Sequence, residues 1–310
     1  MRHVLITGAA GGIGRAIAAE FAAGGAVKSA ARGAAEGVAL TLADRDQEAL
    51  DRVAAELGVT GSGSGSGAGP VGTLTVDLTR PEAAADLVHQ AWQARGPVDV
   101  LVNAAGVYPS LDMGDVSAAD WDRLFAVNLR APVLATGAFA RLAAEHGRGG
   151  AVVNISSGSA LRARPGGGPY ASSKAALEMA TRAAALELGA QGIRVNAVSP
   201  GFVAVDSACN PVSDEYAAAI GTNPLGRAGT PQDIARAVRW IAGPDASWIT
   251  GEILRVDGGS STGALHLPRI WPPDGSGTAD GTPHASTSTP TAVPASSAEA
   301  PAPAKEGNPA

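Results

Sequence analysis

The chain has 310 residues, and 45% of them are hydrophobic, which is enough to bury a sizeable core. Its net charge of −6 argues against a nucleic-acid partner or an anionic membrane surface, because both favour basic proteins. The single cysteine, Cys209, excludes an internal disulfide and favours a reducing cytoplasm, and no apolar run is long enough to span a bilayer.

Low-complexity segments mark the limits of the folded part. Residues 264–310 hold nine of the 21 prolines among Ala, Ser, Thr and Gly, a composition that predicts a disordered tail. Gly61–Pro70 is typical of a flexible linker, and Val27–Gly37 of a short insertion. We therefore expect a single domain over residues 1–263, with insertions near 27–37 and 61–70 and a tail at 264–310.

Along residues 1–263, apolar runs alternate with helical patterns. The runs predict strands at His3–Thr7, Val38–Ala43, Thr73–Asp77, Val98–Val102, Ala151–Ile155, Ile193–Val198 and Glu252–Val256. The helical patterns cover Gly12–Ala23, Gln47–Leu57, Pro81–Ala94, Ala119–His146, Tyr170–Leu188 and Gln232–Ile241. Strands that are apolar on both faces and alternate with helices predict an α/β fold with a doubly wound parallel sheet of seven strands.

A glycine-rich turn, TGAAGGIG, follows the first strand. It spans Thr7–Gly14 and opens the first helix, so backbone N–H groups around Gly8, Gly12, Ile13 and Gly14 can meet a pyrophosphate at the positive end of the helix dipole. The alternative is a tight turn without a ligand.

Asp44 ends the second strand, where a carboxylate can accept the ribose hydroxyls of an adenosine and would repel a 2′-phosphate. The alternative role, a cap of the next helix, suits Asp46 better. Asp44 lies 30 residues after Gly14 instead of the usual 20 or so, and the Val27–Gly37 insertion accounts for the excess. With no basic residue at Ala43 or Gly11, we favour NAD over NADP.

Two further strand ends offer cofactor contacts. Asp77 can receive the adenine amino group and Leu78 can supply a backbone N–H, although Asp77 can equally cap the following helix. Asn103, Ala104 and Gly106 end the fourth strand with small residues that admit a close ligand. These sites lie at the carboxyl ends of strands, where open α/β sheets bind ligands.

Tyr170 and Lys174 are four residues apart on a predicted helix and therefore share a face. A nearby ammonium, together with a positive nicotinamide, lowers the pKa of a phenol and makes it usable as a general acid or base. Ser157 follows the fifth strand and can hold a substrate oxygen beside this phenol, with Ser156 as the competitor. Asn128 can hold a water that links Lys174 to solvent, or be a satisfied core amide.

Taken together, these motifs resemble the short-chain dehydrogenase/reductase family over residues 1–260. The matching segments are Thr7–Gly14, Asp44, Asp77–Leu78, Asn103–Gly106, Asn128, Asn154–Ser157, Tyr170–Lys174, Ser199–Gly201, Pro224–Ala235 and Ile249–Gly259.

The resemblance implies a Rossmann fold and an Asn128–Ser157–Tyr170–Lys174 catalytic group. Tyr170 would exchange the proton, and Lys174 would lower its pKa and bind the nicotinamide ribose. The cofactor would also meet Pro200, Gly201 and, through its backbone, Val203. The family further implies a homo-oligomer, a dimer or tetramer, built on the helices Ala119–His146 and Tyr170–Leu188.

Two positions depart from the family pattern. Ala104 replaces an asparagine, which predicts a looser turn, and Val205 replaces a threonine, which removes a hydroxyl contact to the cofactor. The mobile substrate segment would be Asp206–Asn223, with Cys209 and Tyr216. Other candidate pocket residues are Tyr108, Leu111, Met113, Arg162 and Arg164.

We expect an NAD-dependent oxidoreductase acting on a small secondary alcohol or ketone, without a metal. One alternative is an NADP-dependent reductase of 3-oxoacyl thioesters carried by acyl-carrier protein. The other is a catalytically silent dinucleotide-binding regulatory protein, which would be expected to lack Tyr170 or Lys174.

Overall fold

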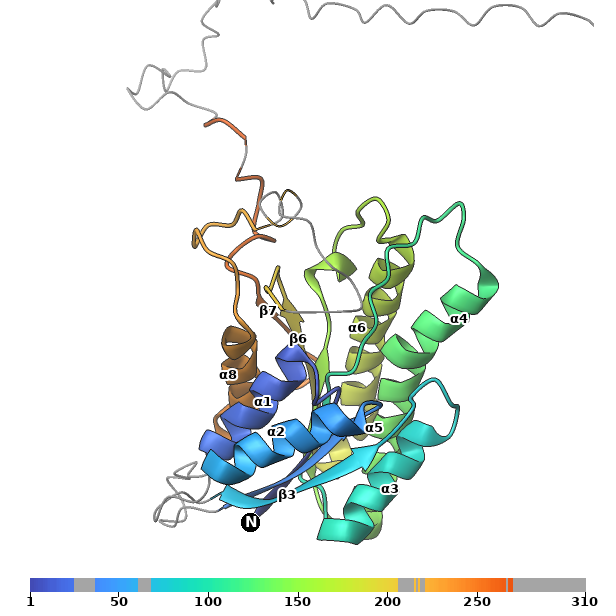
Figure 1. The fold of residues 1–310 in the computed structure, drawn as a ribbon, viewed down its shortest axis with the longest axis vertical. Coiled ribbons are helices and arrows are strands. Elements are labelled where there is room, and N and C mark those ends of the chain that lie inside the picture. Colours follow the sequence, from blue (N-terminus) through green and yellow to red (C-terminus); the bar gives the residue numbers. More distant parts are fainter. Residues whose placement is uncertain are drawn as a thin grey trace, which may run out of the picture. The chain divides into compact units, whose positions relative to one another are not determined.

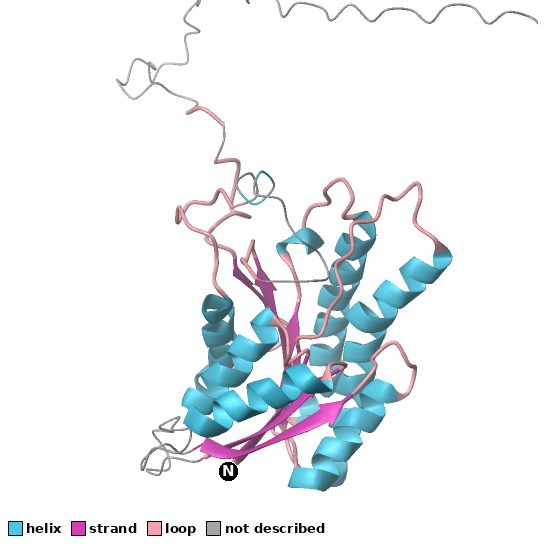
Figure 2. Ribbon diagram, in the orientation of Figure 1, coloured by secondary structure: helices cyan, strands magenta, loops and turns pink. Residues whose placement is uncertain are grey.

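The computed structural model describes residues 1–24, 37–60, 68–205, 215, 217, 221–265 and 267–269. Within them, a twisted sheet lies between two layers of helices (Figures 1 and 2). The strands are β1 (Arg2–Thr7), β2 (Val38–Asp44), β3 (Ala68–Thr75), β4 (Val100–Asn103), β5 (Gly150–Ile155), β6 (Ile193–Pro200) and β7 (Ile253–Val256).

All neighbouring strands pair in parallel, in the order β3-β2-β1-β4-β5-β6-β7. This order confirms the predicted doubly wound, seven-stranded fold. The chain reverses direction across the sheet between β1 and β4, where Thr7 and Asn103 are register partners at the carboxyl ends. Such a switch point is where open α/β sheets bind ligands.

The helices divide between the two faces. They are α1 (Gly12–Ala23), α2 (Gln47–Thr60), α3 (Ala83–Arg95), α4 (Ala118–Phe125), α5 (Ala131–Glu145), α6 (Gly168–Leu188) and α8 (Pro231–Ala242). One core joins the sheet to α1, α2 and α8, with Ile17 and Ile234 fully buried. The other joins it to α3, α5 and α6 around Phe139. Figure 1 shows the two groups on opposite faces.

The predicted end of the Gly61–Pro70 linker is wrong, because β3 already begins at Ala68. Ala68 is the register partner of Val38 in β2, and the register shifts between Val38 and Leu40. Since β3 is the edge strand, Pro70 can lack an N–H without interrupting a ladder on both sides. The strand ends at Thr75 and not at Asp77.

Helix starts differ from the predictions by up to two residues. Pro81 lies in a turn ahead of α3, which begins at Ala83 after Glu82. By contrast, α8 begins at Pro231, one residue before the predicted start. Its capping box pairs the Thr230 hydroxyl with the Asp233 N–H and the Asp233 carboxylate with the Thr230 N–H.

The chain separates into two compact units, residues 1–265 and 266–310. Of the second unit, only residues 267–269 are described, so the predicted tail lies almost wholly outside the described residues, as does most of the Val27–Gly37 insertion. Among the helices that the structure describes, none combines the length and apolarity needed to cross a membrane.

At the amino-terminal edge of the sheet, His3 is a buried ionisable residue. Its imidazole is 3% exposed and bonds to the Gly96 carbonyl at 3.0 Å and the Thr41 hydroxyl at 2.9 Å. Burial lowers the pKa of His3 below its usual 6.5, because the charged imidazolium is poorly solvated there.

This burial predicts a pH-dependent stability. Below pH 6.5 the unfolded chain takes up the His3 proton first, so the free energy of unfolding falls as the pH drops, by at most about 1.4 kcal/mol per pH unit for one proton. Urea unfolding of wild type and His3→Asn between about pH 5 and 7 measures it. The variant should have a shallower slope, and equal slopes would contradict the assignment.

Candidate active site

The turn that joins β1 to α1 depends on glycine. Gly8 has a φ of +68°, and a Cβ there would lie 2.7 Å from the Ala105 backbone. A Cβ on Gly14 would lie 2.0 Å from the Gly8 carbonyl oxygen. Gly11, the N-cap of α1, brings no side chain to the first-turn N–H groups. This end of α1 is therefore suited to an anion such as a pyrophosphate.

Asp44 lies where β2 meets the glycine turn. Its Oδ2 accepts a hydrogen bond from the Ala10 N–H at 3.1 Å, and its Oδ1 accepts one from the Arg45 N–H at 2.7 Å. Asp46 caps α2, accepting a bond from the Ala49 N–H at 2.9 Å. The helix cap is thus Asp46, and the Asp44 carboxylate faces the turn.

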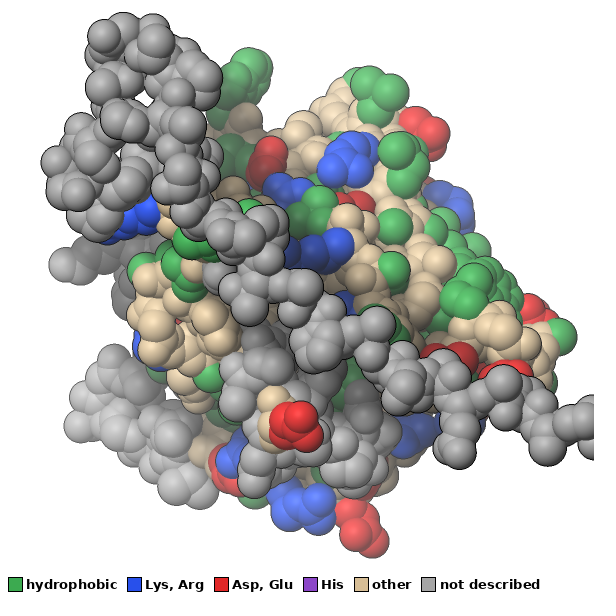
Figure 3. Space-filling view, turned by 90° about the horizontal axis from the view of Figure 1, so that it is seen from above, with side chains coloured by type: hydrophobic (Ala, Val, Ile, Leu, Met, Phe, Trp, Pro, Cys, Tyr) green, Lys and Arg blue, Asp and Glu red, His purple; other side chains and the backbone are tan. Residues whose placement is uncertain are grey.

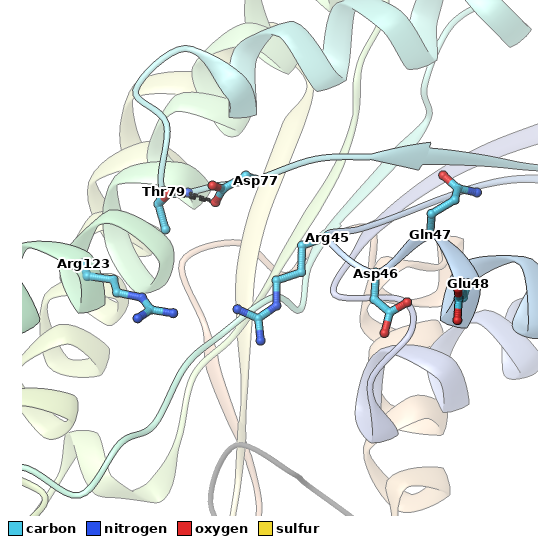
Figure 4. A pocket seen from close by; sticks show the side chains of 7 residues that line it. All are labelled: Arg45, Asp46, Gln47, Glu48, Asp77, Thr79 and Arg123. Carbon is cyan, nitrogen blue, oxygen red and sulfur yellow. Dashed lines mark hydrogen bonds between the residues drawn. The ribbon is translucent and has the colours of Figure 1, made fainter.

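An open pocket of about 950 Å³ lies beside these strand ends. The residues that line it are Arg45, Asp46, Gln47, Glu48, Asp77, Thr79 and Arg123. In Figure 4, the Arg45 and Arg123 side chains extend toward the same space from different elements. Inspection of Ala43 and Gly11 alone misses Arg45, although it directly follows Asp44. Arg123 comes from α4 and carries no sequence signal.

Asp77 closes the turn after β3 and does not cap α3. Its Oδ1 accepts bonds from the Thr79 hydroxyl at 2.7 Å and the Thr79 N–H at 3.0 Å. These two bonds hold the pKa of the Asp77 carboxyl below its ordinary value, the hydroxyl having the larger effect. The side chain of the neighbouring Leu78 packs into the core.

The turn after β4 is anchored to β1. The N–H groups of Ala104 and Ala105 both lie 3.2 Å from the Thr7 hydroxyl oxygen, which accepts from each. Asn103 donates from Nδ2 to Asn154 Oδ1 at 2.8 Å, which joins the ends of β4 and β5. Thr7 was not predicted to have this role, since only its place in the glycine motif is visible in the sequence.

The single helix predicted over Ala119–His146 is wrong. A π-helical turn, η1 (Ala126–Arg130), separates α4 from α5. Its extra residue per turn directs Asn128 toward the Val107 backbone. Asn128 Oδ1 accepts a hydrogen bond from the Val107 N–H at 2.8 Å, and Asn128 Nδ2 donates one to the Val107 carbonyl at 2.8 Å. Asn128 Nδ2 also donates to the Ser173 hydroxyl at 3.1 Å. Asn128 is thus a fully buried and bonded amide.

Asn128 and Lys174 converge beneath the β4 turn. A Cβ on Gly106 would lie 3.5 Å from Asn128 Oδ1 and 3.6 Å from Lys174 Nζ. Lys174 Nζ lies 5.8 Å from the centre of the Tyr170 ring and donates to the Ile155 carbonyl at 2.8 Å. Lys174 is 4% exposed, and this burial lowers the pKa of its ammonium to about 8.

Of the two serines after β5, Ser157 is the one that meets Tyr170. Ser156 is buried and donates from its hydroxyl to Glu178 Oε1 at 2.8 Å. Burial raises the pKa of the Tyr170 phenol above 10, and the hydrogen bond with Ser157 partly opposes that rise. The expected lowering of the phenol pKa is therefore absent from the protein alone, because the loss of solvation has the larger effect.

The segment after β6 lies against the glycine turn. Pro200 ends β6, and a Cβ on Gly201 would lie 2.8 Å from the Asp257 Cα, so the chain passes closely there. Val203 forms an isolated parallel bridge. A Cβ on Gly12 would lie 2.7 Å from Val205 Cγ1, so the valine found at this position packs on the turn.

On the substrate side, the Tyr108 ring meets the Tyr170 ring edge to face, with centroids 6.3 Å apart. Met113 is 61% exposed near the start of α6, and Leu111 donates its N–H to the Gly166 carbonyl. The Arg162 guanidinium donates to the Ser260 carbonyl at 2.7 Å. Cys209, Tyr216 and most of Asp206–Asn223 lie outside the described residues.

Comparison with known proteins identifies the family of the chain. A family model described as "Enoyl-(Acyl carrier protein) reductase" matches residues 8–261. The chain is 36% identical over 258 residues to galactitol 2-dehydrogenase (L-tagatose-forming) of Cereibacter sphaeroides, covering 82% of this chain and 92% of the relative. It is 38% identical over 260 residues to a mouse (3R)-3-hydroxyacyl-CoA dehydrogenase, covering 82% and 94%.

A solved structure of a blue fluorescent protein from a metagenomic library, in complex with NADPH, superposes with a TM-score of 0.68. It is 33% identical, and the match covers 84% of this chain and 98% of that protein. With its parallel sheet, glycine turn and Tyr170–Lys174 pair, the chain belongs to the short-chain dehydrogenase/reductase family. It is an oxidoreductase of that family.

The burial of Lys174 predicts that replacing it raises the stability of the protein while lowering its activity. A pKa of about 8 instead of 10.5 corresponds to a cost of about 3 kcal/mol for the buried charge at neutral pH, of which the bond to Ile155 offsets about 1–2. Lys174→Met should raise the free energy of unfolding by about 1 kcal/mol while turnover falls at least about 100-fold.

Urea unfolding at pH 7 and kcat measure the two effects. Ser172→Ala, an exposed change on the opposite face of the same helix, is the control and should leave turnover unaltered. A destabilised Lys174→Met protein would contradict the desolvation argument.

Proposed function

We propose that the chain is an NAD-dependent dehydrogenase that transfers a hydride between nicotinamide C4 and a secondary alcohol or ketone. Tyr170 is the general acid and base. The observation that carries this proposal is the half-buried Tyr170 side chain, whose phenol interacts with Ser157 and whose ring centre lies 5.8 Å from Lys174 Nζ at the carboxyl ends of the strands. We assign this activity to a domain over residues 1–263.

When bound, the dinucleotide supplies the hydride acceptor for oxidation or the donor for reduction. Tyr170 Oη takes the proton of the alcohol hydroxyl, or returns it to the carbonyl oxygen. Ser157 Oγ holds the same oxygen in place. The buried ammonium of Lys174 favours the phenolate. Both Nδ2 protons of Asn128 are bonded, so the water that carries the proton toward solvent would be held by the second lone pair of its Oδ1.

The chain offers a built site for the dinucleotide. The backbone at the glycine turn fits the pyrophosphate, because glycine leaves the first N–H groups of α1 uncovered. Asp44 fits the adenosine ribose, because its carboxylate borders this turn. The turn after β3 fits the adenine. The residues proposed to hold the cofactor are Gly8, Gly12, Ile13, Gly14, Asp44, Asp77, Leu78, Asn103, Ala104, Gly106, Tyr170, Lys174, Pro200, Gly201 and Val203.

The choice of NAD rests on Asp44. A fixed carboxylate at the end of β2 accepts ribose hydroxyls and repels a 2′-phosphate. Arg45 and Arg123 favour the second candidate, an NADP-dependent reductase, because both line the neighbouring pocket and could attract that phosphate. The solved relative in complex with NADPH supports the same alternative. We favour NAD because Asp44 directly borders the glycine turn.

The substrate is proposed only as a class. One relative is named for galactitol and another for a 3-hydroxyacyl-CoA, and both substrates carry a secondary alcohol. A secondary alcohol or ketone is therefore the chemistry that these names share. The 3-oxoacyl thioester of the alternative activity belongs to the same class.

We also propose a cytoplasmic homo-oligomer, a dimer or tetramer. Apolar side chains on α5 and α6 support it, since Val133 is 43% exposed, Met179 62% and Leu186 86%. Hydrophobic side chains also lie among charged ones on the face drawn in Figure 3. Exposed apolar side chains that form a contiguous patch are typical of surfaces that bind another chain.

Removal of the phenol tests the central assignment. Tyr170→Phe should lower kcat at least about 1,000-fold, because the proton then has no acceptor, while the affinity for NADH changes less than about threefold. A panel of secondary alcohols followed at the absorbance of reduced nicotinamide measures turnover, and NADH fluorescence measures binding. Retained turnover in this variant would refute the role of Tyr170.

Kinetics measured with NAD and with NADP test the cofactor preference. Wild type should use NAD at least about tenfold more efficiently than NADP, because Asp44 opposes the 2′-phosphate. Asp44→Asn keeps an oxygen acceptor for Ala10 but removes the charge, so the ratio of kcat/KM values should move toward one. Asp86→Asn removes an exposed carboxylate of α3 that does not line this pocket, and as the control it should leave the ratio unchanged. A wild-type preference for NADP would favour the alternative.

A further inference from the structure

Glu178 continues the line of Tyr170 and Lys174 along α6, because the three residues are each four apart. It is 5% exposed, although an ionisable carboxyl is seldom buried without partners. The proton path described above gives it no task. Its burial one helical turn beyond Lys174 therefore needs another explanation.

The contacts of Glu178 lead to the catalytic strand end. Its Oε1 accepts the hydrogen bond of the Ser156 hydroxyl at 2.8 Å, and its Oε2 lies 4.0 Å from Arg182 Nη2. Ser156 is 3% exposed and immediately precedes Ser157. One residue earlier, the Ile155 carbonyl accepts from Lys174 Nζ. Two charged side chains of α6 thus hold two successive residues at the end of β5.

The position of Ser157 depends on this attachment. Ser157 is extended, with φ −162° and ψ 149°, and its hydroxyl accepts from the Ser159 N–H at 3.1 Å. Its distance from Tyr170 is set by the peptide that joins it to Ser156, because Tyr170 belongs to the same helix that holds Ser156. A misplacement of about 1 Å in such a group can cost about 100-fold in rate.

We propose that Glu178 is a positioning residue, which places the Ser157 hydroxyl against the Tyr170 phenol by binding the hydroxyl of Ser156. This inference rests on the proposed function, since it gives Ser157 its task. It assigns α6 a further role: the helix that carries Tyr170 and Lys174 also fixes the third polar group of the site.

The neighbouring strand provides a matched control. Ser199 on β6 is also a fully buried serine at a strand end, and its hydroxyl has no hydrogen-bond partner among the residues that the structure describes. The two strands pair in parallel, with Ile155 opposite Val198, so Ser156 and Ser199 occupy equivalent places. Ser199→Ala removes a buried hydroxyl as Ser156→Ala does, but breaks no bond to α6.

The kinetic test compares Ser156→Ala, Glu178→Leu, Glu178→Gln and Ser199→Ala in the full chain. Ser156→Ala and Glu178→Leu should each lower kcat about tenfold or more, and the double variant should lose little beyond either single one. Glu178→Gln keeps the oxygen acceptor and should stay within about threefold of wild type. Ser199→Ala should match wild type, and NADH affinity should stay constant throughout.

A second readout needs no turnover. In protein labelled with ¹³C at the tyrosine Cζ, the Tyr170 resonance, assigned with Tyr170→Phe, reports the Ser157 contact. Glu178→Leu should shift it as Ser157→Ala does, and Glu178→Gln should not. An unshifted resonance in folded Glu178→Leu overturns the proposal, as does a Glu178→Gln protein that loses as much kcat as Glu178→Leu.

The two readouts separate this inference from the proposed function. A wild-type chain without turnover on any alcohol, but with the predicted resonance shifts, would refute the dehydrogenase assignment and leave the positioning role of Glu178 supported. Turnover that depends on Tyr170 but not on Glu178 or Ser156 would support the dehydrogenase assignment and refute the positioning role of Glu178.

Discussion

A lysine buried beneath the end of β5 is the interaction on which the rest of the site depends. Lys174 would be better solvated at the surface, and its pKa of about 8 measures that loss. Its bond to the Ile155 carbonyl ties α6 to β5, and the helix then brings Tyr170 to Ser157 one turn earlier. The unfavourable burial of this charge therefore accompanies a fixed geometry of the reactive groups.

A second constraint acts between β1 and β4, where the strand order reverses. The backbone must pass closely there, so Gly8 and Gly14 have no room for a side chain. The Thr7 hydroxyl then joins β1 to the turn after β4. This close packing places Asp44 beside the turn and leaves Arg45 facing the pocket outside it. We propose that the choice of cofactor follows from the balance between these opposite charges.

Much of this arrangement is predictable from local pattern. Apolar runs separated by amphipathic stretches specify the parallel sheet, and the spacing of Tyr170 and Lys174 specifies a shared helix face. The features that local pattern does not predict depend on contacts between residues that are far apart in the sequence. The π turn at Asn128 satisfies the Val107 backbone, the start of β3 depends on pairing with β2, and Arg123 reaches its pocket only through tertiary packing. The raised pKa of Tyr170 follows from burial, which spacing alone does not reveal.

The phenol therefore needs a positive charge beyond those of the protein, and its titration is the most direct test of the account. Carbon-13 NMR of the Tyr170 Cζ, recorded against pH with and without NAD⁺, measures the pKa of this one group. We expect the pKa to lie above its ordinary value in the free protein and to fall when NAD⁺ binds, because the nicotinamide is cationic. A pKa that NAD⁺ leaves unchanged would contradict the placement of Tyr170 beside the reactive ring.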